Sequence, residues 1–99
     1  MIIVLGELDF HPDDFETVKA LAAALTRETV KEDGCIRYAF GADLMHPNRL
    51  TLGELWRDAA ALDAHLLTPH IQAYRAALKE LRMERRVVQR HEVSATRDL

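Results

Sequence analysis

Apolar and polar positions follow two different periods along this chain of 99 residues. Short runs of aliphatic, aromatic and β-branched residues predict four strands. Apolar residues spaced three and four apart predict amphipathic helices, which begin after proline or aspartate. The predicted strands are residues 1–10, 35–42, 50–56 and 85–94, and the predicted helices are 15–31, 59–66 and a segment from Pro69 to about Leu81. Residues 95–99 are expected to form a loose tail.

The order of these segments is β-α-β-β-α-β, which is the ferredoxin-like pattern of an α+β fold. It predicts an antiparallel four-stranded sheet with the helices on one face. Residues Ile3, Leu5, Leu55 and Val88 are expected on the opposite face. Because a face exposed to water should be polar, we expect that face to pack against a second copy of the chain. The sequence therefore predicts a homodimer.

The length of the chain predicts a single domain over residues 1–99. The net charge of −3 argues against a nucleic-acid partner, which would favour a basic face. The one basic concentration is Arg82, Arg85, Arg86 and Arg90, interpreted as a solvated helix end and strand start. No targeting segment or membrane span is predicted, and a single cysteine, Cys35, favours a reducing compartment. We therefore expect a cytoplasmic protein without a membrane partner.

The candidate chemistry lies in two neighbouring segments. Glu54 shares an otherwise apolar strand face with Trp56, and a buried carboxylate is costly unless it is hydrogen-bonded or lines a cavity. His65 and His70 follow closely, and imidazoles exchange protons near neutral pH. This combination predicts a small pocket with polar groups in an apolar wall.

Three motifs resemble the antibiotic biosynthesis monooxygenase family over nearly the whole chain. They are Glu32-x-Gly34-Cys35-x-x-Tyr38, Leu52-x-Glu54-x-Trp56, and Ala61-x-x-x-His65-x-x-Thr68-Pro69-His70. The resemblance implies a dimeric α+β barrel with a pocket between the sheet and helices of each subunit. It also implies oxidation of phenolic or quinol-type substrates by molecular oxygen without a metal or flavin. In the haem-degrading branch, different residues stand at the positions of Glu7, His65 and Arg75, which argues against a haem cofactor.

Under this resemblance, His65 is the candidate catalytic base, because its pKa suits proton abstraction from a phenol. Candidate substrate-binding residues are Glu54, Trp56, His70, Tyr74 and Tyr38. Each also has a structural interpretation: Trp56 could fill the core with its indole N–H on a carbonyl, and the histidines and tyrosines could be packing residues. The histidines are five residues apart across a proline, and no third ligand is evident, so no metal site is expected.

The favoured function is a cofactor-independent monooxygenase that oxidises a small aromatic, quinol-like molecule. One alternative is a non-catalytic, small-ligand-binding or stress-related protein with the same barrel. Another is an isomerase-type enzyme that uses the same histidine for proton transfer without consuming oxygen. Fold alone does not separate these functions, because the site determines the chemistry. An enclosed pocket beside His65 would favour the enzymes.

Overall fold

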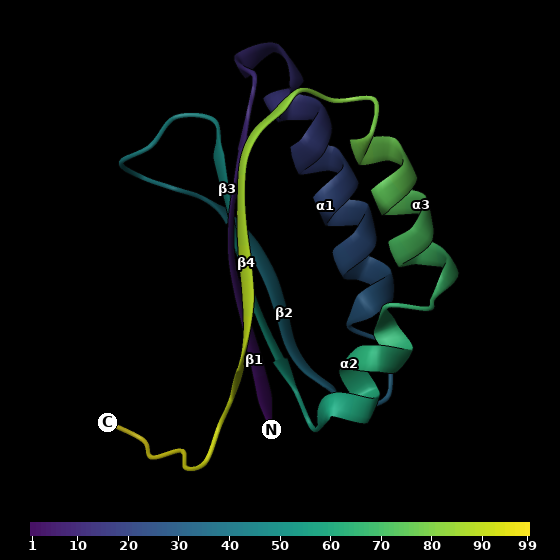
Figure 1. Cartoon of the computed structure of the whole chain (residues 1–99), viewed down its shortest axis with the longest axis vertical. Helices are drawn as coiled ribbons and strands as arrows, with labels where there is room; N and C mark the ends of the chain where they lie inside the picture. Colours follow the sequence, from purple (N-terminus) through teal and green to yellow (C-terminus); the bar gives the residue numbers. More distant parts are fainter.

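The computed structural model describes residues 1–99 and has one antiparallel sheet with all helices on one of its faces (Figure 1). The strands, in the order β2-β3-β1-β4 across the sheet, are β1 (Ile2–Phe10), β2 (Cys35–Ala42), β3 (Arg49–Trp56) and β4 (Met83–Glu92). The helices are α1 (Phe15–Thr29), α2 (Ala59–His65) and α3 (Pro69–Leu78), with a 3₁₀ turn η1 at Pro12–Asp14. The predicted α+β, ferredoxin-like order is confirmed.

The ends of some strands and helices differ from the prediction, because contacts between distant parts of the chain determine them. β4 begins at Met83 rather than at residue 85, because Phe10 pairs with Met83 beyond a bulge in the ladder. Helix α1 ends at Thr29 rather than near residue 31. The following turn contains Gly34 with a φ of 83°, a conformation that favours glycine. A Cβ there would lie 2.5 Å from the Cβ of Ala61, so this turn packs directly on α2.

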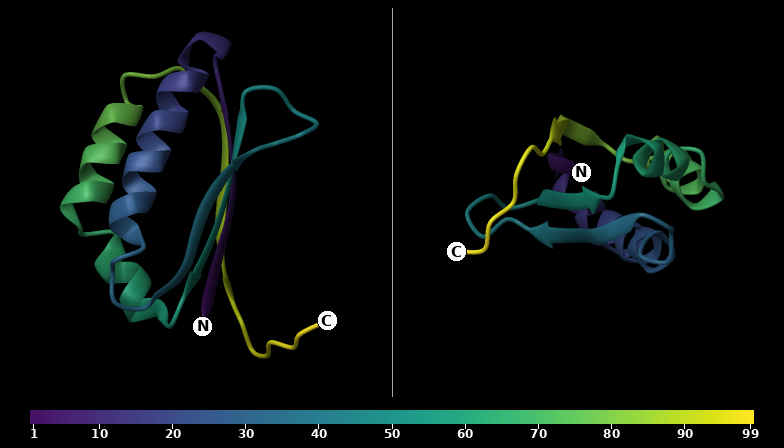
Figure 2. Two further views of the ribbon diagram at one scale, coloured as in Figure 1. Left: turned by 180° about the vertical axis from the view of Figure 1, so that it is seen from behind. Right: turned by 90° about the horizontal axis from the view of Figure 1, so that it is seen from below.

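The core lies between the inner face of the sheet and the helices, which Figure 2 shows stacked on a single side. One cluster centres on Trp56, which is fully buried, and includes Ile2, Val4, Leu25 and Leu62. A second cluster fills the other end of the sheet and consists of Leu8, Phe10, Val18, Ala22 and Leu50. Partly buried side chains, Tyr74 among them, connect the two clusters. The space between the clusters is the part of the fold that concerns function.

The opposite face of the sheet has no helix over it (Figure 1). Leu5 is 54 % exposed there, in agreement with the predicted second apolar face. The prediction for Val88 is wrong: Val88 packs on both core clusters. Its partner in the ladder is Gly6, which shares the inner face with Val4 and Leu8, and Val87 takes the outer position instead. None of the helices is both long and apolar enough to cross a membrane.

Candidate functional site

A cavity of about 320 Å³ lies between the inner face of the sheet and helices α2 and α3. All four strands contribute to its wall, and 11 of its 17 lining residues are hydrophobic. The polar side chains in this wall include Glu54, His65 and Tyr74. A mostly apolar cavity with a few convergent polar groups is typical of a small-molecule site. The predicted pocket beside His65 is therefore present.

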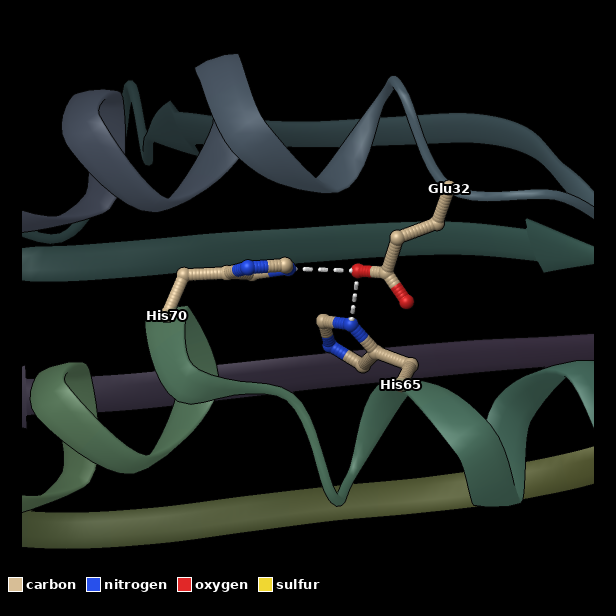
Figure 3. A group of neighbouring side chains, drawn as sticks. All are labelled: Glu32, His65 and His70. Atoms are coloured by element: carbon tan, nitrogen blue, oxygen red, sulfur yellow. Dashed lines mark hydrogen bonds and ion pairs between the residues drawn. The ribbon is translucent and has the colours of Figure 1, made fainter.

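Glu32 joins the two histidines of the sequence motif into one hydrogen-bonded group (Figure 3). The same carboxylate oxygen, Oε2, lies 2.6 Å from Nδ1 of His65 and 2.7 Å from Nε2 of His70. Since a carboxylate only accepts hydrogen bonds, each histidine donates an N–H to it. We call Glu32, His65 and His70 the Glu–His–His cluster. Hydrogen bonds to a charged acceptor are stronger than neutral ones, so the carboxylate holds both rings in place.

Local sequence features bring these three side chains together. The side chain of Asp58 caps the start of α2 at the N–H of Ala61, and His65 is the last residue of that helix. Thr68 and Pro69 restart the chain as α3, which places His70 in its first turn. Glu32 lies in the turn between α1 and β2, just before Gly34. The close packing of that turn on α2 therefore sets the carboxylate against both histidines.

His65 is the most enclosed member of the cluster, at 1 % exposure. Its ring packs on Trp56 at 4.8 Å between centroids and on Tyr38 at 5.4 Å. Burial lowers the pKa of His65 below its ordinary value of 6.5, although the hydrogen bond to Glu32 opposes this. The imidazole is therefore neutral at pH 7. With the proton on Nδ1, the second ring nitrogen, Nε2, is the basic one, and it points away from Glu32 (Figure 3).

Glu54 is a second ionisable group in the cavity wall and is 8 % exposed. The indole Nε1–H of Trp56 donates to its Oε1 at 2.7 Å, so its partner is a carboxylate and not the carbonyl of the structural interpretation. Burial raises the pKa of Glu54 from 4.5 to about 7, and the indole hydrogen bond only partly offsets this. The carboxyl group therefore exchanges a proton near neutral pH, inside the cavity.

Two tyrosines complete the polar part of the wall. Tyr38 is buried in edge-to-face contact with Trp56 and Phe40, and burial raises its pKa well above the ordinary value. Tyr74 comes from α3, and burial raises its pKa to about 12. Its hydroxyl is buried without any hydrogen-bond partner. Such an orphaned group costs free energy, and a bound ligand could satisfy it.

The Glu–His–His cluster is also the one group of side chains that could hold a metal ion. It offers one carboxylate oxygen and two imidazole nitrogens, all within 4.8 Å of one another. Glu32 is thus the third potential ligand that the histidine spacing alone does not suggest. The distances of 2.6 and 2.7 Å are hydrogen-bond lengths, however, and ligands held about 2.1 Å from a metal in a tetrahedral site lie roughly 3.4 Å apart. The rings would have to move before this cluster could take an ion.

The structure places His65, Glu54, Tyr38 and Tyr74 in the cavity wall. Trp56 lies behind that wall and contacts it through Glu54 and His65. The wall also contains Arg75, Arg86 and Arg90, two of which belong to the basic concentration interpreted as a solvated helix end and strand start. Glu32 and these arginines are the residues that sequence reasoning missed. Glu32 stands in a quoted motif, but nothing local in the sequence shows that it faces helix α2.

Comparison with known proteins gives a family match. The family model described as antibiotic biosynthesis monooxygenase matches residues 1–77. The Escherichia coli protein named "Probable quinol monooxygenase YgiN" is 33 % identical over 90 % of this chain and 97 % of its own length. An uncharacterized protein of Synechocystis is 36 % identical over 74 % of this chain, which spans about half the length of that relative.

Solved structures agree with this match. The crystal structure described as a "putative antibiotic biosynthesis monooxygenase" from Deinococcus radiodurans superposes with a TM-score of 0.94 at 25 % identity, and the match covers 100 % of this chain and 98 % of that one. The structure of Rv0793 from Mycobacterium tuberculosis gives a TM-score of 0.89 at 29 % identity, over 98 % of each chain. The fold of this chain is therefore that of these proteins throughout its length.

Proposed function

The chain belongs to the antibiotic biosynthesis monooxygenase family, and we propose that it oxidises a small aromatic, quinol-like substrate with molecular oxygen, without a metal or flavin. The observation that supports this most is the arrangement of His65. Glu32 fixes the ring through Nδ1, which leaves a neutral, basic Nε2 in a residue that lines an apolar cavity. The name of the Escherichia coli relative, a probable quinol monooxygenase, supports the quinol class of substrate.

His65 acts as the general base in this proposal. Its Nε2 takes the proton of a phenolic hydroxyl, and the resulting imidazolium is stabilised by the carboxylate of Glu32. Burial alone would make that cation costly, so the hydrogen bond to Glu32 is what allows His65 to hold the proton. General-base catalysis of this kind contributes about 10²–10⁴-fold in rate. The phenolate formed is electron-rich enough to pass an electron to oxygen.

The substrate supplies every electron that the reaction needs. One atom of the oxygen molecule is added to a ring carbon, and the other leaves as water together with two hydrogens of the substrate. A hydroquinone with a free ring position would thus become a hydroxyquinone, with one O₂ consumed and one H₂O formed. No external reductant enters this balance. The mostly apolar wall around the ring would limit the access of water to the reactive phenolate.

The other candidate residues hold the substrate or fix the groups that act on it. Glu54, with its pKa of about 7, can accept a hydrogen bond from a second substrate hydroxyl or donate one to a carbonyl. Trp56 fixes the Glu54 carboxylate, and His70 helps to fix Glu32. Tyr38 presents its ring, and Tyr74 offers its unpartnered hydroxyl. His65 alone receives a proton from the reacting group.

We also propose that the active form is a homodimer in which the helix-free faces of two sheets meet. Leu5, Ile3 and Leu55 lie on that face, and burying them would remove apolar surface from water. The cavity lies on the other side of the sheet, so the two cavities of a dimer would be separate. We place the reaction in the cytoplasm, because the one cysteine, Cys35, is a free thiol that suits a reducing compartment.

The test is oxygen uptake by the purified, chelator-treated protein across a panel of hydroquinones and anthrones. We expect uptake of one O₂ per substrate, with one ¹⁸O atom from ¹⁸O₂ in the product and one in water. His65→Ala should lower the rate at least about tenfold at pH 7, whereas His46→Ala, which changes an exposed histidine in the β2–β3 turn, should not. Tight binding of these compounds without oxygen uptake would support the small-ligand-binding alternative and contradict the monooxygenase.

A further inference from the structure

Three arginines line the part of the cavity wall that edge strand β4 and helix α3 contribute. Arg86 and Arg90 project from the inner face of β4, because they pair across the ladder with Leu8 and Val4. Arg75 comes from α3, next to Tyr74. The protein as a whole has a net charge of −3, yet the residues of this wall that are charged at every ordinary pH are the three arginines. The cavity therefore differs in charge from the surface around it.

The ion pairs of the chain leave two of these arginines free. Arg82 pairs with Asp14, and Arg85 pairs with Glu7 at 2.7 Å. Arg90 lies 3.9 Å from Asp63, at the limit of an ion pair. Arg86 and Arg75 have no carboxylate partner, and both line the cavity. A cation that lines a cavity without a partner in the chain is available to a ligand.

The hydroxyl of Tyr74 lies near these charges and is also unsatisfied. Its oxygen is buried and has no hydrogen-bond partner, although a buried hydroxyl ordinarily has one. Arg86 is close enough to Tyr74 to act on its ionisation. Arg86 thus stands near the hydroxyl of Tyr74, Arg75 lines the same cavity, and none of the three has a hydrogen-bond acceptor within the chain. An anionic oxygen pair would satisfy them.

We infer that the substrate or ligand of this cavity is an aromatic compound that carries a carboxylate, held by Arg86, Arg75 and the hydroxyl of Tyr74. This inference rests on the proposed function, because it names the class of substrate that the same cavity binds. It assigns Arg86 and Arg75 as specificity-determining residues, which bind the acid group and do not take part in the proton transfer. A neutral quinol would bring no anionic group to the two exposed arginines.

The ladder gives the length of such a compound. Glu54 lies beside Val4, and Arg86 lies beside Leu8, on the same face of the sheet. Four residues of β-strand span roughly 13 Å, and the two steps from β3 across β1 to β4 add roughly 10 Å at right angles, so the two backbone positions are roughly 16 Å apart. The side chains of Glu54 and Arg86 occupy part of that distance. A two-ring aromatic acid fits between the two ends. Its hydroxylated ring would lie by Glu54 and His65, and its carboxylate would lie by Arg86.

A pair of compounds that differ only in charge tests this inference. The compounds are 2-naphthoate and its neutral isostere 2-naphthamide, and calorimetric titration measures their affinities for the full chain. Neither compound has a hydroxyl to oxidise, so the measurement is independent of oxygen chemistry. We expect the protein to bind the naphthoate at least about tenfold more tightly, since a hydrogen bond to a charged group commonly contributes that much. The preference should shrink between 0.05 and 0.5 M salt, because the arginines are exposed.

Arginine variants then identify the side chain that binds the carboxylate of naphthoate. Arg86→Gln and the double variant Arg86→Gln/Arg75→Gln should lose most of the preference for naphthoate and keep the affinity for naphthamide. Arg27→Gln, an exposed arginine of α1 outside the cavity, is the matched control and should keep the preference. Equal affinities for the two compounds would overturn the inference, as would a preference that survives the double variant or no measurable binding of naphthoate. A protein that prefers naphthoate but consumes no oxygen would refute the monooxygenase and leave this inference standing.

Discussion

The carboxyl group of Glu54 should make the stability of this protein fall as the pH rises from about 4.5 to neutrality. Burial raises its pKa from 4.5 in the unfolded chain to about 7 in the folded one. Below pH 4.5 the group is protonated in both states and has no effect on the free energy of unfolding. Between pH 4.5 and 7 the folded state keeps a proton that the unfolded state has lost, so the folded state is progressively disfavoured. Above pH 7 the loss is complete.

The size of this effect follows from the two pKa values. At about 1.4 kcal/mol for each unit of pH, the rise from 4.5 to about 7 costs about 3 kcal/mol of stability at pH 8. That is a large fraction of the total stability of a small protein. Glu54→Gln removes the titration and keeps an oxygen that accepts the indole N–H of Trp56. The free energy of unfolding of the variant should therefore rise relative to that of the parent as the pH rises. The new amide can also change the stability by an amount that does not depend on pH, and this does not affect the trend.

Urea unfolding from pH 4.5 to 8.5, at one protein concentration and followed by the fluorescence of Trp56, measures this difference. We expect the free energy of unfolding of the variant, minus that of the parent, to rise by about 3 kcal/mol over this range. His65 titrates in both proteins and cancels from the difference. Glu80→Gln, at an exposed position, should show no such rise. A difference that stays constant within about 0.5 kcal/mol would show that Glu54 ionises as freely as a surface carboxylate and would refute the reasoning.

Three further predictions concern packing and assembly. Trp56→Ala should cost about 3–5 kcal/mol, because the ring is fully buried, and a thermal melt close to that of the parent would contradict this. Tyr74→Phe should leave the free energy of unfolding unchanged or raise it by about 1 kcal/mol, since it removes an unpartnered hydroxyl; a clear loss would mean that the hydroxyl has a partner. Sedimentation at micromolar concentration should give twice the chain mass of 11.3 kDa, and Leu5→Glu should halve it; a parent that sediments as a monomer would rule out the dimer.

The fold was predictable because its signals are local. Pro12 and Pro69 at helix starts, Gly34 after α1, and the caps of α2 and α3 all act over a few residues, and the structure uses each of them. The ends of β4 and the side of the sheet that Val88 takes were not predictable. Both depend on the register against β1, which sits more than seventy residues away in the chain. A shift of one residue moves every side chain of a strand to the other face.

The site was predictable in part for the same reason. Glu54 and His65 could be proposed from their own neighbours, since a carboxylate in an apolar strand face and a histidine at a helix end are local observations. Glu32 lies 33 residues from His65 and 38 from His70, and only the packing of the turn on α2 brings it to both rings. Arg86 looked like part of a solvated charged run. Its role depends on the face of β4 from which it projects, and the pairing register of β4 with β1 determines that face.

The pH–rate profile of His65→Ala tests the central claim most directly. With a substrate that the parent oxidises, the variant should keep its fold and dimer and consume oxygen at least about tenfold more slowly at pH 7. Because the parent has a base with a lowered pKa, its rate should fall in acid, as His65 becomes protonated. The deficit of the variant should shrink as the pH approaches the phenol's own pKa of about 10, where the substrate ionises unaided. A variant that turns over as fast as the parent at pH 7, or a deficit that is the same at every pH, would contradict the assignment of His65 as the base.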